Sequence, residues 1–231
     1  MLGIIGAMEV EVAALKEAMS DSTIEKKAEM EFCKGKLDGK PVVVVRSGIG
    51  KVNAAICAQI LVDCFRVSAV VNTGVAGSLN AGINIGDIVL SKTILQHDMD
   101  ATGFGYAPGV IPQMSCSVFE GDADMIRLAK KICETEIPEI SAYEGRIVSG
   151  DQFISDKKVK ARLVKTFAGD CCEMEGAAIA QAAYLDHIPF LIIRAISDKA
   201  DDSAHMDYPT FEAQAAEHSF RLVRAFAAAW E

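Results

Sequence analysis

The sequence of 231 residues lacks any apolar run long enough to cross a membrane. Its apolar runs, such as 42–45 and 190–193, have the length of a β-strand, whereas a bilayer requires about 20 residues. The first residues, MLGIIGAMEVE, also lack the basic region and the long apolar stretch of a signal peptide. We therefore expect no membrane segment and a cytoplasmic location.

Metal-binding patterns are also missing. The seven cysteines form no CxxC pair, and the four histidines are scattered along the chain. A structural zinc site would need four ligands at closer, patterned spacing. We expect reduced thiols, no bound metal and no cofactor.

The net charge is −9 with a pI near 5.0. This balance argues against binding to a nucleic-acid backbone. No repeat, linker or low-complexity segment divides the chain. With 51% hydrophobic residues, the chain can bury one sizeable core, so we expect a single domain over residues 1–231.

Short apolar runs alternate with segments of helical periodicity, which predicts alternating strands and helices. Strands are expected at 2–6, 31–37, 42–46, 67–72, 86–96, 141–148 and 190–196. Helices are expected at 10–19, 52–65, 122–136, 156–167, 175–185 and from residue 209 onward. The pattern predicts an α/β fold, a three-layer α/β/α sandwich with a mixed central sheet.

Two connecting segments are candidates for a functional site. Residues 73–78 (TGVAGS) follow a predicted strand and are expected to form a glycine-containing loop that approaches a ligand closely. Residues 97–117 are expected to form a long loop, and loops of this length are usually functional or form interfaces.

Carboxylates lie where predicted strands end, at Glu11, Glu175 and Asp198. A carboxylate-rich site without metal-binding histidines suits a cationic transition state, such as the oxocarbenium-like sugar of glycosidic cleavage. More ordinary roles are open: Glu11 as an acid in the first turn of a helix, and Asp198 as a cap or turn residue. On these residues alone, the chain is a small-molecule α/β enzyme.

Six segments in order, GIIGAMEVE, SGIGKVNAA, NTGVAG, VSGDQFI, EMEGAAIA and RAISD, resemble bacterial 5′-methylthioadenosine/S-adenosylhomocysteine nucleosidases. The resemblance runs nearly end to end and implies the nucleoside phosphorylase/hydrolase fold, a homodimer and a part in methionine salvage. The implied reaction is hydrolysis of the N-glycosidic bond of an adenine nucleoside, releasing adenine and a 5-thioribose product.

The resemblance also implies roles for single residues. Glu11 would activate the attacking water with help from Arg194, and Asp198 would protonate adenine N7. Glu175 and Met174 would bind the ribose, and Phe153 and Ile154 would hold the adenine. Phe104 and Pro112 would reach into the partner's site and line its pocket for the 5′-alkylthio group. The full expected set of substrate-binding residues is Glu173, Met174, Glu175, Phe153, Ile154, Val75, Ala76, Gly77, Phe104, Pro112 and Phe211.

One position departs from the family pattern. Some members carry serine where this chain has Val75, and that hydroxyl helps to hold the water. Water would then be held by Glu11 and Arg194, with Ser78 as a nearby hydroxyl.

Three alternatives remain open at this stage. A phosphorolytic relative would use phosphate, but carboxylates near the first segment would repel that anion. An aminodeoxyfutalosine hydrolase of menaquinone synthesis would use the same adenine and ribose contacts. A catalytically silent nucleoside-binding protein would not need Glu11, Glu175 and Asp198 together.

Overall fold

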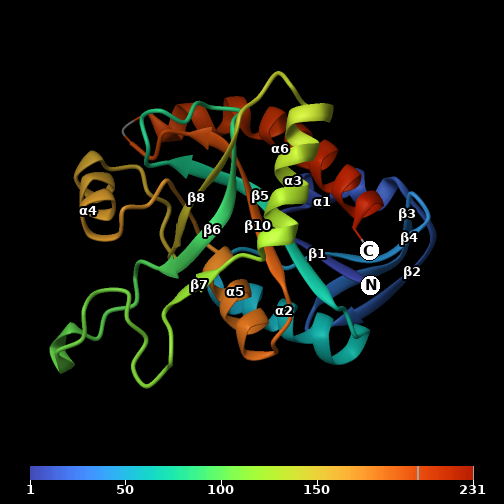
Figure 1. Cartoon of the computed structure of the whole chain (residues 1–231), viewed down its shortest axis with the longest axis horizontal. Helices are drawn as coiled ribbons and strands as arrows, with labels where there is room; N and C mark the ends of the chain where they lie inside the picture. The colour runs from blue at the N-terminus through green and yellow to red at the C-terminus, as the bar shows by residue number, and fades with distance from the viewer. Residues whose placement is uncertain (202, 231) are drawn as a thin grey trace.

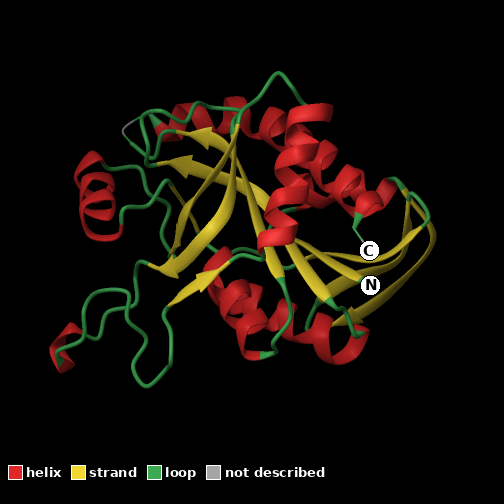
Figure 2. Cartoon of the chain, viewed as in Figure 1, coloured by secondary structure: helices red, strands yellow, loops and turns green. Residues whose placement is uncertain are grey.

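The computed structural model describes residues 1–201 and 203–230. A mixed sheet lies between two groups of helices (Figures 1 and 2), which confirms the predicted α/β fold. Its strands are β1 (Leu2–Gly6), β2 (Met19–Lys27), β3 (Met30–Leu37), β4 (Lys40–Arg46), β5 (Ala69–Ser78), β6 (Ile88–Gln96), β7 (Val118–Glu120), β8 (Ala142–Ser149), β9 (Cys171–Glu173) and β10 (Phe190–Asp198). The helices are α1 (Glu9–Glu17), α2 (Lys51–Phe65), the 3-10 turn η1 (Thr102–Phe104), α3 (Ala123–Glu136), α4 (Lys157–Phe167), α5 (Gly176–Leu185) and α6 (Ala204–Ala229).

The strands follow the order β10-β6-β8-β9-β5-β1-β4-β3-β2 in the sheet, and β10 also pairs with β5. The five strands β10, β6, β8, β9 and β5 therefore close into a ring at one side of the sheet. Strands β4, β1, β5 and β10 run parallel to their neighbours in that series. Their carboxyl ends meet at one edge, where open α/β sheets usually bind ligands.

Two hydrophobic cores cover the two faces of the sheet. One core joins α2 and α5 to the sheet, and it includes Leu61, Phe65 and Ile179. The other joins α1, α3 and α6 to the opposite face, and it includes Leu15 and Phe226. This arrangement gives the three layers expected from the sequence. No helix in the described parts of the chain has both the length and the apolar character to cross a membrane.

The prediction of a loop at 73–78 is wrong, because these residues continue β5. They pair with β10 over Thr73 to Gly77 and with β9 at Gly77 and Ser78. Apart from the Val75 N–H, which donates to Glu11 Oε1, this backbone pairs within the sheet, so the glycines here do not make a turn.

Three strands and one helix boundary also differ from the prediction. β2 was missed because it is largely exposed and carries no apolar alternation, and β7 and β9 are only three residues long. The last helix begins at Ala204 rather than near Pro209, which lies inside it. The segment 97–117 does form a long connection, and it extends away from the sheet (Figure 1).

The core on the α2 side predicts a large effect of truncating Leu61. This side chain is fully buried and packs toward Gly3 of β1, where an added Cβ would lie 3.0 Å from Leu61 Cδ1. We expect Leu61→Ala to lower the free energy of unfolding by about 2–5 kcal/mol. Ile24→Ala, at a position 65% exposed, is expected to change it by less than about 0.5 kcal/mol. Urea denaturation measures both, and equal losses would contradict this assignment of the core.

Candidate active site

A cavity of about 330 Å³ opens at the edge where the parallel strands end. It is lined by Ala7, Met8, Glu11, Ile49, Val75, Ala76, Gly77, Gln152, Phe153, Ile154, Cys172, Glu173, Met174, Glu175, Ser197, Asp198 and Tyr208. Ten of the residues expected from the sequence therefore lie around one cavity. They come from segments far apart in the chain, brought together by the parallel strands.

Glu11 lies in the first turn of α1, directly after β1, and its side chain turns into the cavity wall. Its Oε2 accepts hydrogen bonds from the backbone N–H groups of Ala7 (2.6 Å) and Met8 (2.9 Å), and its Oε1 accepts one from Val75 (3.2 Å). Burial raises its pKa, while the charge of Arg194 and these backbone donors act in the opposite direction. The Glu11 carboxylate is therefore fixed in place by backbone hydrogen bonds, and its raised pKa makes it more basic, as a general base requires.

Gly74 and Gly77 on β5 leave room for the acidic side chains. A Cβ on Gly74 would lie 2.7 Å from Glu11 Oε1, and a Cβ on Gly77 would lie 2.7 Å from Asp198 Oδ1. Both distances are below van der Waals contact, so any side chain would displace a carboxylate. The glycines of the TGVAG segment are therefore needed for close approach and not for a turn.

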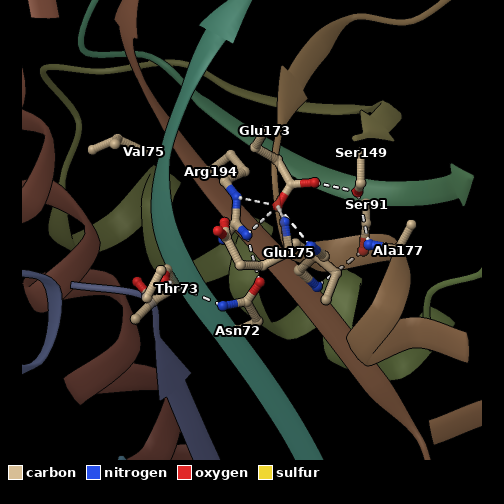
Figure 3. A network of polar contacts seen from close by, with 12 residues as sticks. Asn72, Thr73, Val75, Ser91, Ser149, Glu173, Glu175, Ala177 and Arg194 are labelled. Atoms are coloured by element: carbon tan, nitrogen blue, oxygen red, sulfur yellow. Dashed lines mark hydrogen bonds and ion pairs between the residues drawn. The ribbon is translucent and has the colours of Figure 1, made fainter. Parts of the chain in front are cut away.

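Arg194 lies beneath the cavity floor and is 1% exposed. Its guanidinium donates to Glu173 Oε2 through Nε (3.2 Å) and Nη2 (2.5 Å), and Nη2 also donates to Asn72 Oδ1 (2.5 Å), as Figure 3 shows. Arg194 does not line the cavity in the described structure. Arg194 acts on Glu11 through its charge, which lowers the pKa of Glu11, and the charge of Glu11 in turn raises the pKa of Arg194.

Glu173 connects the Arg194 guanidinium to the first residues of α5. One of its oxygens accepts from the backbone N–H groups of Glu175 (3.1 Å) and Gly176 (2.7 Å), and the other accepts from Ser149 Oγ. The carboxylate uses its acceptor capacity inside the protein, although one edge reaches the cavity. Glu173 therefore supports the site more than it contacts a ligand.

Glu175 is the N-cap residue of α5 and faces the cavity. Its Oε1 accepts a hydrogen bond from the backbone N–H of Gly50 (2.8 Å). Burial, followed by the charge of Glu173, raises the pKa of Glu175 to about 7. One hydrogen bond leaves acceptor capacity free toward the cavity, which suits a partner with hydroxyl groups.

Asp198 is the last residue of β10 and is 2% exposed. Its Oδ1 accepts from Ala200 N (2.7 Å) and its Oδ2 accepts from Ser197 Oγ (3.0 Å). Burial raises its pKa, and the two hydrogen bonds lower it by less. A buried carboxyl that holds its proton more readily than usual is suited to act as an acid.

An apolar wall faces these carboxyl groups. Phe153 is 47% exposed and meets the ring of Tyr208 edge to face, with centroids 6.0 Å apart. Tyr208 also lines the cavity and was not predicted from the sequence. Phe211 was chosen instead and does not line the cavity, because α6 turns Tyr208, three residues earlier, toward it.

Three other expected residues lie elsewhere. Phe104 is 88% exposed on η1, and Pro112 is half-buried in the same long connection; neither lines the cavity of its own chain. Ser78 Oγ donates to the backbone oxygens of Asn80 (2.7 Å) and Ile83 (3.3 Å), so it is not the nearby hydroxyl that was expected. Val75 lines the cavity and contributes its backbone N–H to Glu11.

The fold and the site place the chain in a class of proteins. A model of the phosphorylase superfamily matches residues 1–228. A 5′-methylthioadenosine/S-adenosylhomocysteine nucleosidase of an Exiguobacterium species is 40% identical over 97% of this chain and 96% of its own length. The chain belongs to this nucleosidase family, whose members are N-glycosidase hydrolases, within the phosphorylase superfamily.

Solved structures agree with this assignment. A nucleosidase of the same name from Neisseria meningitidis, in complex with methylthio-immucillin-A, is 38% identical, with a TM-score of 0.94 over 98% of each chain. A futalosine hydrolase mutant of Helicobacter pylori is 32% identical, with a TM-score of 0.92 over 97% of each chain. The same fold therefore occurs in a 5′-methylthioadenosine/S-adenosylhomocysteine nucleosidase and in a futalosine hydrolase.

The raised pKa of Glu175 predicts a pH dependence of stability. The unfolded chain loses this proton near its usual pKa of 4.5, whereas the folded chain loses it near 7. The stabilising contribution of the neutral carboxyl is therefore complete below about pH 4.5 and is lost as the pH rises through 7. Relative to Glu175→Gln, we expect the wild type to lose up to about 3 kcal/mol of unfolding free energy over this window.

Urea denaturation of both proteins between pH 4.5 and 8 measures this difference. Glu120→Gln, at an exposed position, serves as the control and is expected to follow the wild type. A difference between wild type and Glu175→Gln that stays constant with pH would contradict the raised pKa.

Proposed function

We propose that this protein hydrolyses the N-glycosidic bond of 5′-methylthioadenosine and S-adenosylhomocysteine. The observation that carries the proposal is the placement of Glu11, Glu175 and Asp198 around one cavity, each with a pKa raised by burial. The names of the relatives support the same substrates. Release of free adenine from these nucleosides is the test, and the two variants described below assign the roles.

Asp198 is proposed as the acid for the departing base. Protonation of adenine at N7 makes the base a neutral leaving group, and burial of Asp198 favours its protonated form in the free protein. Phe153 offers an aromatic face to the base, and the backbone around Ile154 offers polar groups for its edge. Cleavage of the bond then develops positive charge on the ribose.

Glu175 and Glu11 are proposed to act on the sugar side. Glu175 would accept hydrogen bonds from the ribose hydroxyls and stabilise the cationic ring electrostatically, with Met174 packing beside it. Glu11 would take a proton from the attacking water, which supplies the new C1 oxygen of the sugar. Arg194 would act on Glu11 through its charge and not through a hydrogen bond, because its guanidinium donates to Glu173, Asn72 and a backbone oxygen.

Hydrolysis is favoured over phosphorolysis by the charges at the cavity. Among the described residues that line it, four are acidic and none is lysine or arginine. Arg194 is the nearest candidate for binding an anion, and its guanidinium is already engaged by Glu173. A phosphate would lack the cationic donors that usually hold it.

An aminodeoxyfutalosine hydrolase remains the second candidate, because a futalosine hydrolase shares this fold at 32% identity. The methylthioadenosine assignment is better supported by the higher identities of the relatives that carry that name. Rates on the three nucleosides distinguish the two candidates.

We also propose a homodimer in which Phe104 and Pro112 complete the partner's site. Apolar residues are exposed side by side on α2 and α5, among them Val52, Ile56 and Leu185. Phe104 is exposed on the projecting connection, where a second chain would bury its ring. We further propose a cytoplasmic setting, which the seven free cysteines support, and a part in methionine salvage, which would follow from cleavage of 5′-methylthioadenosine.

Asp198→Asn is expected to lower kcat by a factor of about 100 to 10,000, because an amide can accept a hydrogen bond or donate one but cannot deliver the proton. Binding of the nucleoside should persist, and calorimetry measures it separately from adenine release. Asp201→Asn, at the neighbouring half-buried carboxylate that does not line the cavity, is the matched control. Turnover of Asp198→Asn within twofold of the control would place the acid elsewhere.

Glu11→Gln is expected to abolish water activation with a loss of kcat of similar size, since the amide keeps the shape of the side chain and loses its basicity. The measurement is adenine release in phosphate-free buffer. Glu17→Gln, on the exposed side of α1, is the control for changes in the helix itself. An unchanged kcat would reassign the base.

A further inference from the structure

One wall of the active-site cavity is a segment that belongs to no helix or strand. Residues 151–154, which we call the adenine segment, lie between β8 and α4, and Gln152, Phe153 and Ile154 in it line the cavity. Ile154 is buried in a small hydrophobic cluster, which fixes the far end of the segment. The roles proposed above do not explain what fixes the near end, at Asp151.

The start of α2 provides the first contact for Asp151. The first N–H groups of a helix have no partner within it, and the N-cap residue here is Gly50, which has no side chain to bind them. The Gly50 N–H donates to Glu175 Oε1 at 2.8 Å, and the Lys51 N–H donates to Asp151 Oδ1 at 2.8 Å. Two neighbouring N–H groups of α2 therefore hold the proposed ribose carboxylate and the first residue of the adenine segment.

Glycine is required at this N-cap. Gly50 has a φ of +96°, which a residue with a side chain rarely adopts. An added Cβ would also lie 3.1 Å from Asp151 Oδ1. The close approach of Asp151 to α2 thus depends on the absence of a side chain at residue 50.

Asp98 completes a cycle of contacts with Lys51 and Asp151. Asp98 lies two residues after β6, where the long connection begins. Its Oδ1 accepts a hydrogen bond from Lys51 Nζ at 2.6 Å, and its Oδ2 accepts one from the Asp151 N–H at 2.9 Å. Lys51 Nζ also donates to Gln96 Oε1 at 2.9 Å, which fixes the ammonium group. Each member of the cycle therefore contacts the other two.

The charge of Asp98 is needed for both of its contacts. The side chains of Lys51 and Asp98 are only 17% and 19% exposed. Burial would raise the pKa of Asp98, but the hydrogen bonds from Lys51 and Asp151 lower it below its ordinary value. The carboxylate accepts on both oxygens, whereas an asparagine has one oxygen and could serve only one of the two donors.

We propose that Asp98 is a positioning residue for the base, which holds the adenine segment against the start of α2 through Asp151 and Lys51. Asp98 does not line the cavity, so it would act without touching the substrate. Loss of its contacts would let Phe153 and the backbone beside it move relative to Glu175. The proposal rests on the proposed function and extends it to a residue outside the cavity.

The test measures binding of free adenine to the full-length protein by calorimetry. Asp98→Asn is expected to raise the Kd for adenine roughly fivefold, the effect of one partly solvated hydrogen bond. The KM for 5′-methylthioadenosine should rise by a similar factor, while kcat falls by less because the three acids keep their own contacts. Asp100→Asn is the control, because Asp100 is an exposed carboxylate whose hydrogen bonds come from Thr102.

The Kd separates positioning from a general loss of structure. A variant that is only less stable has fewer adenine sites per chain, but its folded molecules keep the Kd of the wild type. Lys51→Met breaks the same cycle from α2, so it also tests the proposal if Asp98→Asn does not fold. It is expected to raise the Kd by a similar factor, and the double variant should show no further rise.

The outcomes separate the positioning role from the reaction. If the wild type releases adenine but Asp98→Asn and Asp100→Asn have the same Kd within about twofold, the positioning role is wrong and the proposed function stands. Additive effects of Asp98→Asn and Lys51→Met would also contradict the cycle. If the wild type releases adenine from neither nucleoside, the proposed function fails and the positioning role fails with it.

Discussion

One buried guanidinium, that of Arg194, has to compensate three buried carboxylates, those of Glu11, Glu173 and Glu175. Of these three carboxylates, only Glu173 pairs directly with Arg194, with 2.5 Å between Glu173 Oε2 and Arg194 Nη2. The charge of Arg194 acts on Glu11 and Glu175 at longer range. A single positive charge does not offset the desolvation of three negative charges. The pKa values of Glu11 and Glu175 therefore stay raised, and the cavity between them favours a ligand that becomes positively charged.

The sheet makes this arrangement possible because its parallel strands deliver acids to one edge. Glu11 follows β1, Asp198 ends β10, and β5 lies between these strands with glycines at the two places where the carboxylates approach it. Gly74 and Gly77 are thus as much a part of the site as the acids. A side chain at either position would move one of the two carboxylates that we propose act in the reaction.

The sequence predicted the elements whose pattern is set by burial and missed those that tertiary pairing creates. Strands such as 190–196 are apolar except for Arg194 because both faces are covered, so they are visible in the sequence. β2 is exposed and exists because it pairs with β3, and residues 73–78 are strand because β10 lies beside them. The glycines in this segment led to the prediction of a loop. In the structure, glycine is needed because a side chain at Gly74 or Gly77 would collide with a neighbouring carboxylate.

The same limit applies to the site. Glu11, Glu175 and Asp198 could be predicted because they occur in ordered segments that resemble a known family. Tyr208 was missed because the choice between it and Phe211 depends on the rotation of α6, which the sequence does not reveal. The positions of Phe104 and Pro112 relative to a site depend on a second chain, so they remain a prediction.

The central claim is that water, and not phosphate, attacks the sugar while the buried acids act on the two sides of the glycosidic bond. Mass spectrometry of the products formed from 5′-methylthioadenosine in a buffer that contains phosphate tests it most directly. Attack by water gives adenine and free 5-methylthioribose, with the same yield when phosphate is omitted. A sugar 1-phosphate, or recovery of the intact nucleoside, would contradict it.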